Sequence, residues 1–348
     1  MDDALVNVLA TCDKEVKILT SPDGSEILLL PYGGRILGLF SAGSRENFFW
    51  TNPLLKKPET AITFFSGKDW QNTGGDRTWL APEIDFFFPK FPDRTEYVQP
   101  RQLDPGNYAV RGVENQIELI NECSLVPSRS KKEIQIRISK KIEPAPNPIR
   151  YEPMLESLFA VEYAGYTLIS TLELLAPNDE ATIGLWNLLQ MPHTGTMLIP
   201  TFSRTNPNIY FGDLSEDDLI VGEHMVCYRM RAAGEQKIGV RAVCATGRVG
   251  YMRSGDAWSL VVRKFTVNPS GEYVDVPWQN SDDLGYGVQA CNVNSGLGSF
   301  SELEYHVPAI GGKTGHDRCT DTTQVWAFRG AGEKIIRLAQ FLLGRLAL

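Results

Sequence analysis

Residues 300–307 have the sequence FSELEYHV, and this stretch indicates the fold class of the chain. Successive side chains of a β-strand point to opposite faces of a sheet, so every second residue shares one surface. A strand here places Glu302, Glu304 and His306 on one face, with apolar or aromatic side chains on the other. The stretch therefore predicts a β-strand that brings three titratable groups to a single surface.

Similar runs recur from one end of the chain to the other. They alternate in polarity or are rich in β-branched residues, and clusters of Gly, Pro, Asn and Asp that are typical of turns separate them. Because helical patterns are sparse, the chain is predicted to be a nearly all-β sandwich with many strands. The other predicted strands are residues 26–30, 108–113, 116–121, 133–139, 166–174, 237–243, 259–267 and 287–293.

One short helix is predicted near the C-terminus, at about residues 333–346. Hydrophobic side chains recur there at helical spacing and form one apolar face. We expect this face to pack against the outside of the sandwich. A helix that lies on a membrane surface is the alternative interpretation.

Residues 143–153, EPAPNPIRYEP, form the clearest linker-like segment of the chain. Proline fixes φ and lacks the N–H group that a central strand needs, so the segment could separate two halves. The sequences before and after it look alike, however, and nothing marks a second core. We therefore expect a single domain over residues 1–348, with this segment as a long crossing loop.

The composition excludes some classes of function. Of 348 residues, 43% are hydrophobic and 22% charged, which is typical of a globular protein with a substantial core. The 42 acidic residues outnumber the 34 basic ones, and the formal net charge of -8 disfavours nucleic acid as a partner. No apolar run approaches the roughly 18 residues of a membrane-spanning helix, and the N-terminus is acidic where a signal peptide is basic. We expect a cytoplasmic protein with no membrane partner; a periplasmic or secreted protein whose leader has been removed is the alternative.

Residues 72–83, NTGGDRTWLAPE, concentrate side chains that could bind a sugar. Trp79 offers a flat apolar face, and Arg77 with Asp76 or Glu83 offers charged hydrogen bonds. A sugar has one apolar ring face and a rim of hydroxyl groups, so this combination suits it. A buried structural loop with an internal Asp–Arg pair explains the same residues, and both interpretations remain open.

Carboxylates and histidines supply the candidates for acid–base chemistry. If the predicted strand lines a cleft, mutual repulsion and partial burial of Glu302 and Glu304 raise the pKa of one of them into the range of a general base. A solvated strand face is the alternative. His193 follows an apolar segment and is the histidine best placed for acid catalysis, with a surface position as the alternative.

Known cofactor and metal motifs are absent from the sequence. The chain has no GxSxG, HExxH, EF-hand or dinucleotide-binding motif. Its six cysteines are spread singly, without the CxxC or CxH spacing that lets neighbouring residues share a metal. We therefore expect neither a metal nor an organic cofactor.

Five segments together resemble the galactose mutarotase-like superfamily, and specifically its uncharacterised bacterial members. The resemblance implies a β-supersandwich whose concave face binds a sugar. In the enzymes of this superfamily a late-strand glutamate deprotonates the anomeric hydroxyl while a histidine protonates the ring oxygen, without a metal or a cofactor. The segments, which extend in the expected order from about residue 30 to about residue 310, are 32–39 (YGGRILGL), 47–53 (NFFWTNP), 74–83 (GGDRTWLAPE), 185–190 (LWNLLQ) and 300–306 (FSELEYH).

The resemblance also implies roles for particular residues. Glu302 or Glu304 would be the base. The central histidine of the epimerases, which would be the acid, has no clean match near Trp186. His193 is the candidate for the acid, although it is displaced from the expected position. Contacts to a sugar or oligosaccharide would come from the remaining candidates, Asp76, Arg77, Trp79, Glu83, Trp186 and His306.

Three functions are compatible with these expectations. The first is an aldose 1-epimerase-like mutarotase, and the second is a non-catalytic carbohydrate-binding protein with a mutarotase-like cleft. The third, a lyase or hydrolase acting on polysaccharide, is less favoured because the chain lacks the helical catalytic domain that accompanies such enzymes. Fold alone does not decide among them.

Overall fold

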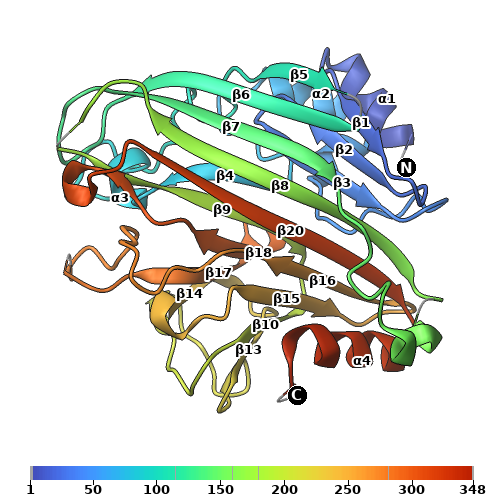
Figure 1. Ribbon diagram of the computed structural model, residues 1–348. Helices are drawn as coiled ribbons and strands as arrows, with labels where there is room; N and C mark the ends of the chain where they lie inside the picture. Colours follow the sequence, from blue (N-terminus) through green and yellow to red (C-terminus); the bar gives the residue numbers. More distant parts are fainter. Residues whose placement is uncertain (1–2, 114, 159, 179, 281, 347–348) are drawn as a thin grey trace.

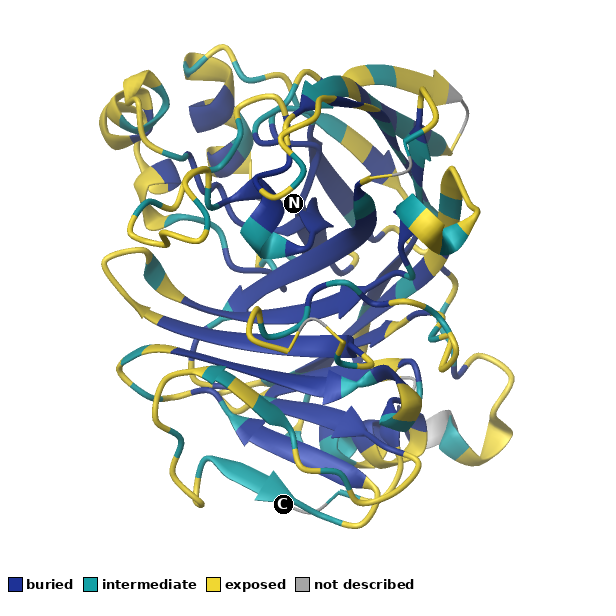
Figure 2. Cartoon of the chain, turned by 90° about the vertical axis from the view of Figure 1, so that its left-hand side faces the viewer, coloured by how far each residue is buried: buried dark blue, intermediate teal, exposed yellow. Residues whose placement is uncertain are grey.

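The computed structural model describes residues 3–346 except residues 114, 159, 179 and 281. It consists mainly of two antiparallel β-sheets (Figure 1). The strands are buried along much of their length, whereas the connecting loops carry most of the exposed residues (Figure 2). The prediction of a nearly all-β sandwich with a short C-terminal helix is therefore confirmed.

The first sheet holds nine strands in one path and a tenth, β19, that pairs with β9. Its central strands come from distant parts of the chain, because β4 lies next to β9 and β9 lies next to β18. In spatial order the strands are β1 (Lys17–Thr20), β2 (Glu26–Leu30), β3 (Arg35–Phe40), β4 (Asp76–Ala81), β9 (Thr182–Pro192), β18 (Gly298–His306), β17 (Tyr286–Ser295), β14 (Gly234–Arg241) and β11 (Asn208–Phe211), with β19 at Ile310–Gly311.

The second sheet has ten strands in one path. Its longest strands, β8 and β20, are neighbours and pair over twelve registered positions. In spatial order the strands are β12 (Leu219–Val221), β13 (Met225–Arg229), β10 (Thr196–Pro200), β15 (Arg248–Arg253), β16 (Trp258–Lys264), β20 (Arg318–Gly330), β8 (Glu162–Leu174), β7 (Ile134–Pro144), β6 (Gln116–Leu125) and β5 (Ala109–Val113).

Each strand predicted from sequence overlaps a strand of the structure. The segment 26–30 coincides with β2, and 300–307 corresponds to β18. The main difference is residues 76–81, which we expected in a loop and which form β4. Gly75 precedes this strand with φ of 76°, and a Cβ there would lie 2.3 Å from the carbonyl oxygen of Ile36. The glycine therefore lets β4 pack closely on β3.

Alternating side chains of the second sheet contribute to hydrophobic cores on both of its faces. In β16, Val261 belongs to the main core between the sheets, whereas Leu260 and Val262 belong to a second core on the other face of the second sheet. Helix α4 (Gly332–Leu343) covers this second core with side chains such as Leu338 (Figure 1). The expected packing of a C-terminal helix on the outside of the sandwich is confirmed.

Helix α4 ends three residues earlier than predicted. Gly344 follows it with φ of 95°, a left-handed conformation that suits glycine, and its N–H donates to the carbonyl of Gln340. The backbone therefore leaves the helical path although hydrophobic residues continue beyond it.

Two further helices were not predicted. Helix α1 (Asp3–Thr11) and helix α2 (Pro58–Ser66) contact one another and cover the outer face of β2 and β3. Their apolar faces are short, and in α2 only Ala61 is fully buried. A short helix with so few core residues leaves a weak periodic signal.

The remaining helical elements are short. Helix α3 (Glu83–Phe86) directly follows β4, and the 3-10 turns are η1 (Pro53–Lys56), η2 (Pro153–Leu158), η3 (Ala242–Cys244) and η4 (Gly312–Thr314). In the described part of the chain, no helix has both the length and the apolar character needed to cross a membrane.

The proline-rich segment at residues 143–153 connects β7 to β8, which are neighbours in the second sheet. Ala145 and Ile149 are buried in the same core as helix α4. The segment is thus a packed connection within one sheet rather than a bridge between two sheets.

Candidate functional site

Five adjacent strands of the first sheet, β4, β9, β18, β17 and β14, carry the candidate site on the face that points away from the second sheet. The strand register aligns Trp79, Trp186 and His306 in one row across β4, β9 and β18. Glu304 and Glu302 precede His306 by two and four residues, so the alternation of β18 places them on the same face. The structure therefore brings these five predicted residues together.

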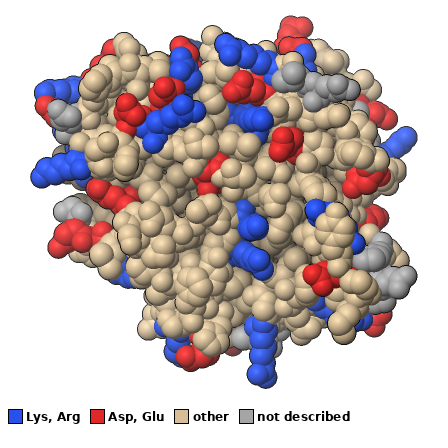
Figure 3. Space-filling model, viewed as in Figure 1, with Lys and Arg blue, Asp and Glu red and all other residues tan. Residues whose placement is uncertain are grey.

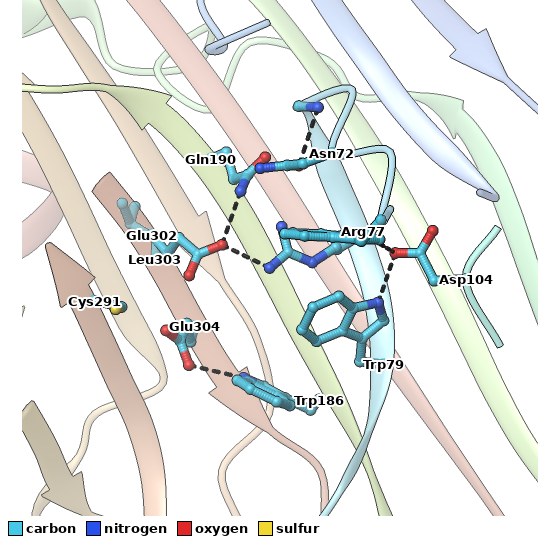
Figure 4. A network of polar contacts seen from close by, with 12 residues as sticks. Asn72, Arg77, Trp79, Asp104, Trp186, Gln190, Cys291, Glu302, Leu303 and Glu304 are labelled. Atoms are coloured by element: carbon cyan, nitrogen blue, oxygen red, sulfur yellow. Dashed lines mark hydrogen bonds and ion pairs between the residues drawn. The ribbon is translucent and has the colours of Figure 1, made fainter. Parts of the chain in front are cut away.

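Arg77 and Glu302 form a buried ion pair at the centre of this face (Figure 4). Arg77 Nη2 lies 2.7 Å from Glu302 Oε1, and Gln190 Nε2 donates to the same oxygen at 3.0 Å. The guanidinium also lies over the ring of Trp79, 4.1 Å from its centroid, and 5.2 Å from that of Trp70. These contacts fix the Glu302 carboxylate in one orientation.

Glu304 is the second carboxylate, and only 1% of it is exposed. Trp186 Nε1 donates to its Oε2 at 2.8 Å, and Lys237 Nζ lies 3.4 Å from that oxygen. Burial raises the pKa of Glu304 to about 7, with a smaller increase from the charge of Glu302, although Lys237 acts in the opposite direction. Glu304 therefore titrates near neutral pH.

Lys237, on β14, supplies a buried ammonium that sequence analysis did not identify. Its Nζ lies 4.3 Å from the ring centroid of Trp186 and 3.8 Å from Glu83 Oε2. Burial alone would lower the pKa of Lys237, but the surrounding carboxylates Glu304, Glu83 and Asp275 outweigh it and raise that pKa. The lysine is therefore protonated at neutral pH.

His306 occupies the other end of the row. Its ring stacks on Trp186 with 5.7 Å between centroids, and its Nε2 lies 4.0 Å from Asp275 Oδ2. Burial lowers the pKa of His306 to about 4, although Asp275 acts in the opposite direction. The imidazole is therefore neutral at pH 7.

Asp275 comes from the loop between β16 and β17. It accepts hydrogen bonds from Gln289 Nε2 at 2.9 Å and from the backbone N–H of Glu83 at 2.8 Å. Glu83 in turn accepts a hydrogen bond from Tyr97 at 2.8 Å. These hydrogen bonds hold the start of helix α3 next to this loop, beside Lys237.

The prediction that Asp76 acts beside Arg77 is wrong. Asp76 is the first residue of β4 and points to the opposite face, into the core between the sheets. There it binds Arg263 Nη2 at 3.0 Å and accepts a hydrogen bond from Tyr166 at 2.6 Å. Neighbouring residues of a strand face opposite ways, so Asp76 and Arg77 cannot share one surface.

The prediction that His193 serves this site as an acid is also wrong. Its Nε2 lies 2.8 Å from Asn292 Oδ1, and Asn292 alternates in β17 with Cys291, which faces Glu302 and Glu304. The His193 carbonyl accepts a hydrogen bond from Arg253 of the second sheet. His193 therefore lies at the end of the core between the sheets.

The two tryptophans lie in the site, but other side chains already cover part of them. Trp79 Nε1 donates to Asp104 Oδ2 at 2.9 Å, and the same oxygen accepts hydrogen bonds from Trp70 and Arg35. The Trp186 ring contacts both Lys237 and His306. Both indoles are nearly fully buried, and they orient charged groups rather than offering open stacking faces.

Sequence analysis missed Lys237, Gln190, Asp104 and Asp275. Gln190 could have been found, because it is a polar residue within the apolar run of β9. Lys237 begins a predicted strand like many surface lysines, and nothing in the sequence shows that β14 lies two strands from Glu302.

A cavity of about 400 Å³ adjoins the site. Trp70 and Tyr97 line it, and these residues contact Arg77 and Glu83 respectively. Asp104, which orients Trp79, also forms part of its wall. A larger hollow of about 860 Å³ lies over β6, and none of the predicted site residues lines it. None of the predicted site residues lines the smaller cavity either, and it meets the site only through Trp70, Tyr97 and Asp104.

Cys291, Glu302 and Glu304 are close enough to share a metal ion, with ligand atoms within 4.8 Å of one another (Figure 4). One oxygen of each carboxylate, however, already contacts a cation, Arg77 or Lys237. Burial also raises the pKa of the Cys291 thiol well above its usual value, so the sulfur stays protonated at neutral pH. A metal ion would therefore have to displace these cations and the thiol proton.

Among the described residues, the face of the molecule seen in Figure 3 carries no large cluster of charged side chains of one sign. Lysine and arginine side chains are interspersed there with acidic ones. This face therefore has no continuous basic patch, whereas the absence of a nucleic-acid partner stays a prediction.

Comparison with known proteins gives one family and several similar structures. Galactose 1-epimerase from Lactobacillus acidophilus NCFM is 7% identical, with a TM-score of 0.44 over 91% of this chain and 95% of that chain. The GalM/aldose epimerase homologue from C. elegans is also 7% identical, with a TM-score of 0.40 over 90% and 98%. HI1317 has 7% identity and a TM-score of 0.44 over 90% and 93%.

No curated protein sequence matches the chain. Residues 3–346 match the model of a family of unknown function, DUF6786. Because the match spans nearly the whole sequence, the chain belongs to this family.

Proposed function

We propose that the chain binds a sugar at the face that carries Arg77, Glu302 and Glu304, and that it interconverts the anomers of that sugar as an aldose 1-epimerase-like mutarotase. One observation carries this proposal. Buried polar atoms on this face lack a hydrogen-bond partner among the described residues, and a polyhydroxylated ligand would satisfy them. They are Arg77 Nε and Nη1, Gln190 Oε1, Gln289 Oε1, Glu304 Oε1 and His306 Nε2.

These atoms include both donors and acceptors. Arg77 can only donate, and the free oxygen of Glu304 accepts when that carboxylate is ionised. Sugar hydroxyl groups both donate and accept, so neighbouring hydroxyls of one ring could serve both kinds of atom. The resemblance of residues 74–83 and 300–306 to segments of mutarotases agrees with this proposal.

Glu304 is the proposed proton acceptor. A general base works best when its pKa lies near the working pH, and burial raises the pKa of Glu304 to about 7. Its Oε1 is one of the unpartnered atoms, whereas Glu302 Oε1 already accepts from Arg77 and Gln190. Glu302 would instead orient Arg77 toward the sugar.

Exchange NMR or polarimetry on a panel of aldoses tests the proposal. The wild-type chain should accelerate anomer interconversion of at least one sugar, and E304Q should lower kcat by about 100-fold or more, the scale of general acid–base catalysis. D321N is the matched control, because Asp321 is a buried carboxylate that binds Tyr305 in the core between the sheets. No acceleration of neutral, acidic or phosphorylated sugars would refute the proposal.

A non-catalytic carbohydrate-binding protein is the second candidate. The position of His193 favours it, because that histidine faces the core between the sheets and no longer fits the role of acid. Titration calorimetry that detects a sugar, together with unchanged anomer exchange, would support this candidate over the enzyme.

A further inference from the structure

Ring opening of an aldose needs a proton donor for the ring oxygen as well as a base. His193 lies on the wrong side of the sheet for this task. His306 lies on the correct face, but burial lowers its pKa to about 4, so it is neutral at pH 7 and a poor acid. The proposed reaction therefore needs another donor on this face.

Lys237 is placed to be that donor. It enters the site from β14, where it pairs with Cys291 of β17, and Cys291 pairs with Glu302 of β18. Only 3% of the lysine is exposed, and Trp186 holds its ammonium at 4.3 Å from the ring centroid. The side chain thus reaches the same group of residues as the proposed base.

The ammonium has donor capacity to spare. Lysine carries three N–H groups, and the two nearby carboxylates, Glu304 at 3.4 Å and Glu83 at 3.8 Å, account for at most two. A third N–H can therefore reach a ligand. The free oxygen of Glu304 belongs to the same carboxylate that contacts Lys237, so one sugar could meet both groups.

The two groups are also electrostatically coupled. Among the neighbours that favour the charged form of Lys237, the carboxylate of Glu304 contributes most, followed by Glu83 and Asp275. When Glu304 gains a proton its negative charge disappears, and Lys237 then holds its own proton less tightly. Proton uptake by the base thus prepares the lysine to release a proton.

Resting on the proposed mutarotase function, we infer that Lys237 is the general acid, which donates a proton to the ring oxygen while Glu304 accepts the proton of the anomeric hydroxyl. The bond between the anomeric carbon and the ring oxygen breaks, and its electron pair goes to the ring oxygen. The anomeric O–H electrons form the aldehyde C=O. After rotation of the aldehyde, the reverse transfers close the ring and restore charged Lys237 and ionised Glu304.

Four variants separate this role from a structural one. K237R keeps the positive charge but replaces the compact ammonium with a planar guanidinium that cannot place an N–H group at the same point, so sugar affinity should fall by no more than a few-fold while kcat drops about 100-fold or more. K237A should lose kcat similarly and regain part of it when methylamine is added. H306Q removes one proposed ligand contact, so it should weaken sugar affinity, while kcat at saturating sugar falls far less than in K237R. K140M is the matched control, because Lys140 is a fully buried lysine in the core between the sheets, where it binds the carbonyl of Gly34.

Calorimetry for sugar affinity and exchange NMR for kcat distinguish the possible results. If the wild type is active and K237R keeps its kcat, the acid role of Lys237 is overturned. The same holds if H306Q rather than K237R loses kcat. In both cases the proposed function itself stands. A wild type that accelerates no aldose would refute the proposed function and the acid role with it. Loss of kcat in K237R with retained binding, and methylamine rescue of K237A, would support the inference.

Discussion

Replacement of Glu304 by Gln should change how the free energy of unfolding depends on pH. Burial raises the pKa of Glu304 from 4.5 to about 7. Between these values the folded chain holds a proton that the unfolded chain has lost, so the wild-type chain loses stability as the pH rises through this window. This difference in pKa between the folded and the unfolded chain corresponds to a change in stability of about 3 kcal/mol. E304Q removes this pH dependence because its amide does not titrate.

His306 provides an internal check because its effect has the opposite sign. Burial lowers its pKa from 6.5 to about 4. Between these values the unfolded chain binds the additional proton, so this histidine makes stability rise with pH, again by about 3 kcal/mol. In the wild-type chain the two effects largely cancel between pH 4.5 and 6.5. E304Q should therefore reveal the rise caused by His306, and H306Q the fall caused by Glu304.

Urea unfolding measured at intervals from pH 4 to pH 8 tests this prediction. The quantity to follow is the difference in the free energy of unfolding between wild type and each variant, because contributions from other groups are largely shared. Wild type minus E304Q should decline by about 3 kcal/mol between pH 4.5 and 7. A flat difference would mean that Glu304 is ionised throughout, and the proposed base would lose its main physical support.

Three further substitutions probe other parts of the structure. D76N should destabilise the chain by about 3 kcal/mol or more in urea unfolding, because it leaves Arg263 buried without its counter-ion; a loss below 1 kcal/mol would show that the pair is solvated. H193Q should leave kcat for anomer exchange unchanged, since its ring contacts Asn292 in the core between the sheets, and a large loss would restore His193 as the acid. G75A should lower the thermal midpoint markedly, because a Cβ would meet the Ile36 carbonyl oxygen at 2.3 Å with φ of 76°; a wild-type midpoint would disprove the close packing of β3 and β4.

The part of the site on β18 could be predicted because strand alternation is a local property. Glu302, Glu304 and His306 are two residues apart, and any strand over this segment places them on one face. The same rule, applied to residues 76–81, would have separated Asp76 from Arg77. The segment was expected to be a loop because Gly74 and Gly75, just before it, suggested a turn, and the turn in fact precedes β4.

Other parts of the site depend on which strands become neighbours. Lys237 and Glu304 are 67 residues apart in the numbering of the chain, and they meet only because β14 and β18 flank β17. Asp275 comes from a loop and reaches the site through hydrogen bonds to Gln289 and Glu83. Sequence patterns report the period of each strand but not the order of strands in a sheet, so these contacts could not be derived from the sequence.

The charge balance of the site explains why one carboxylate suits the proposed role of base while its neighbour is held in an ion pair. Four carboxylates, Glu83, Asp275, Glu302 and Glu304, face two cations, Arg77 and Lys237. With all groups ionised, two negative charges are uncompensated in a buried setting, which is costly. Glu302 is hydrogen-bonded by Arg77 and Gln190, and the cost falls on Glu83 and Glu304: burial raises the pKa of both carboxyl groups, that of Glu304 to about 7. Accepting a proton from a sugar hydroxyl would relieve this cost, so the same burial that destabilises the ionised carboxylate suits it to the proposed role of base.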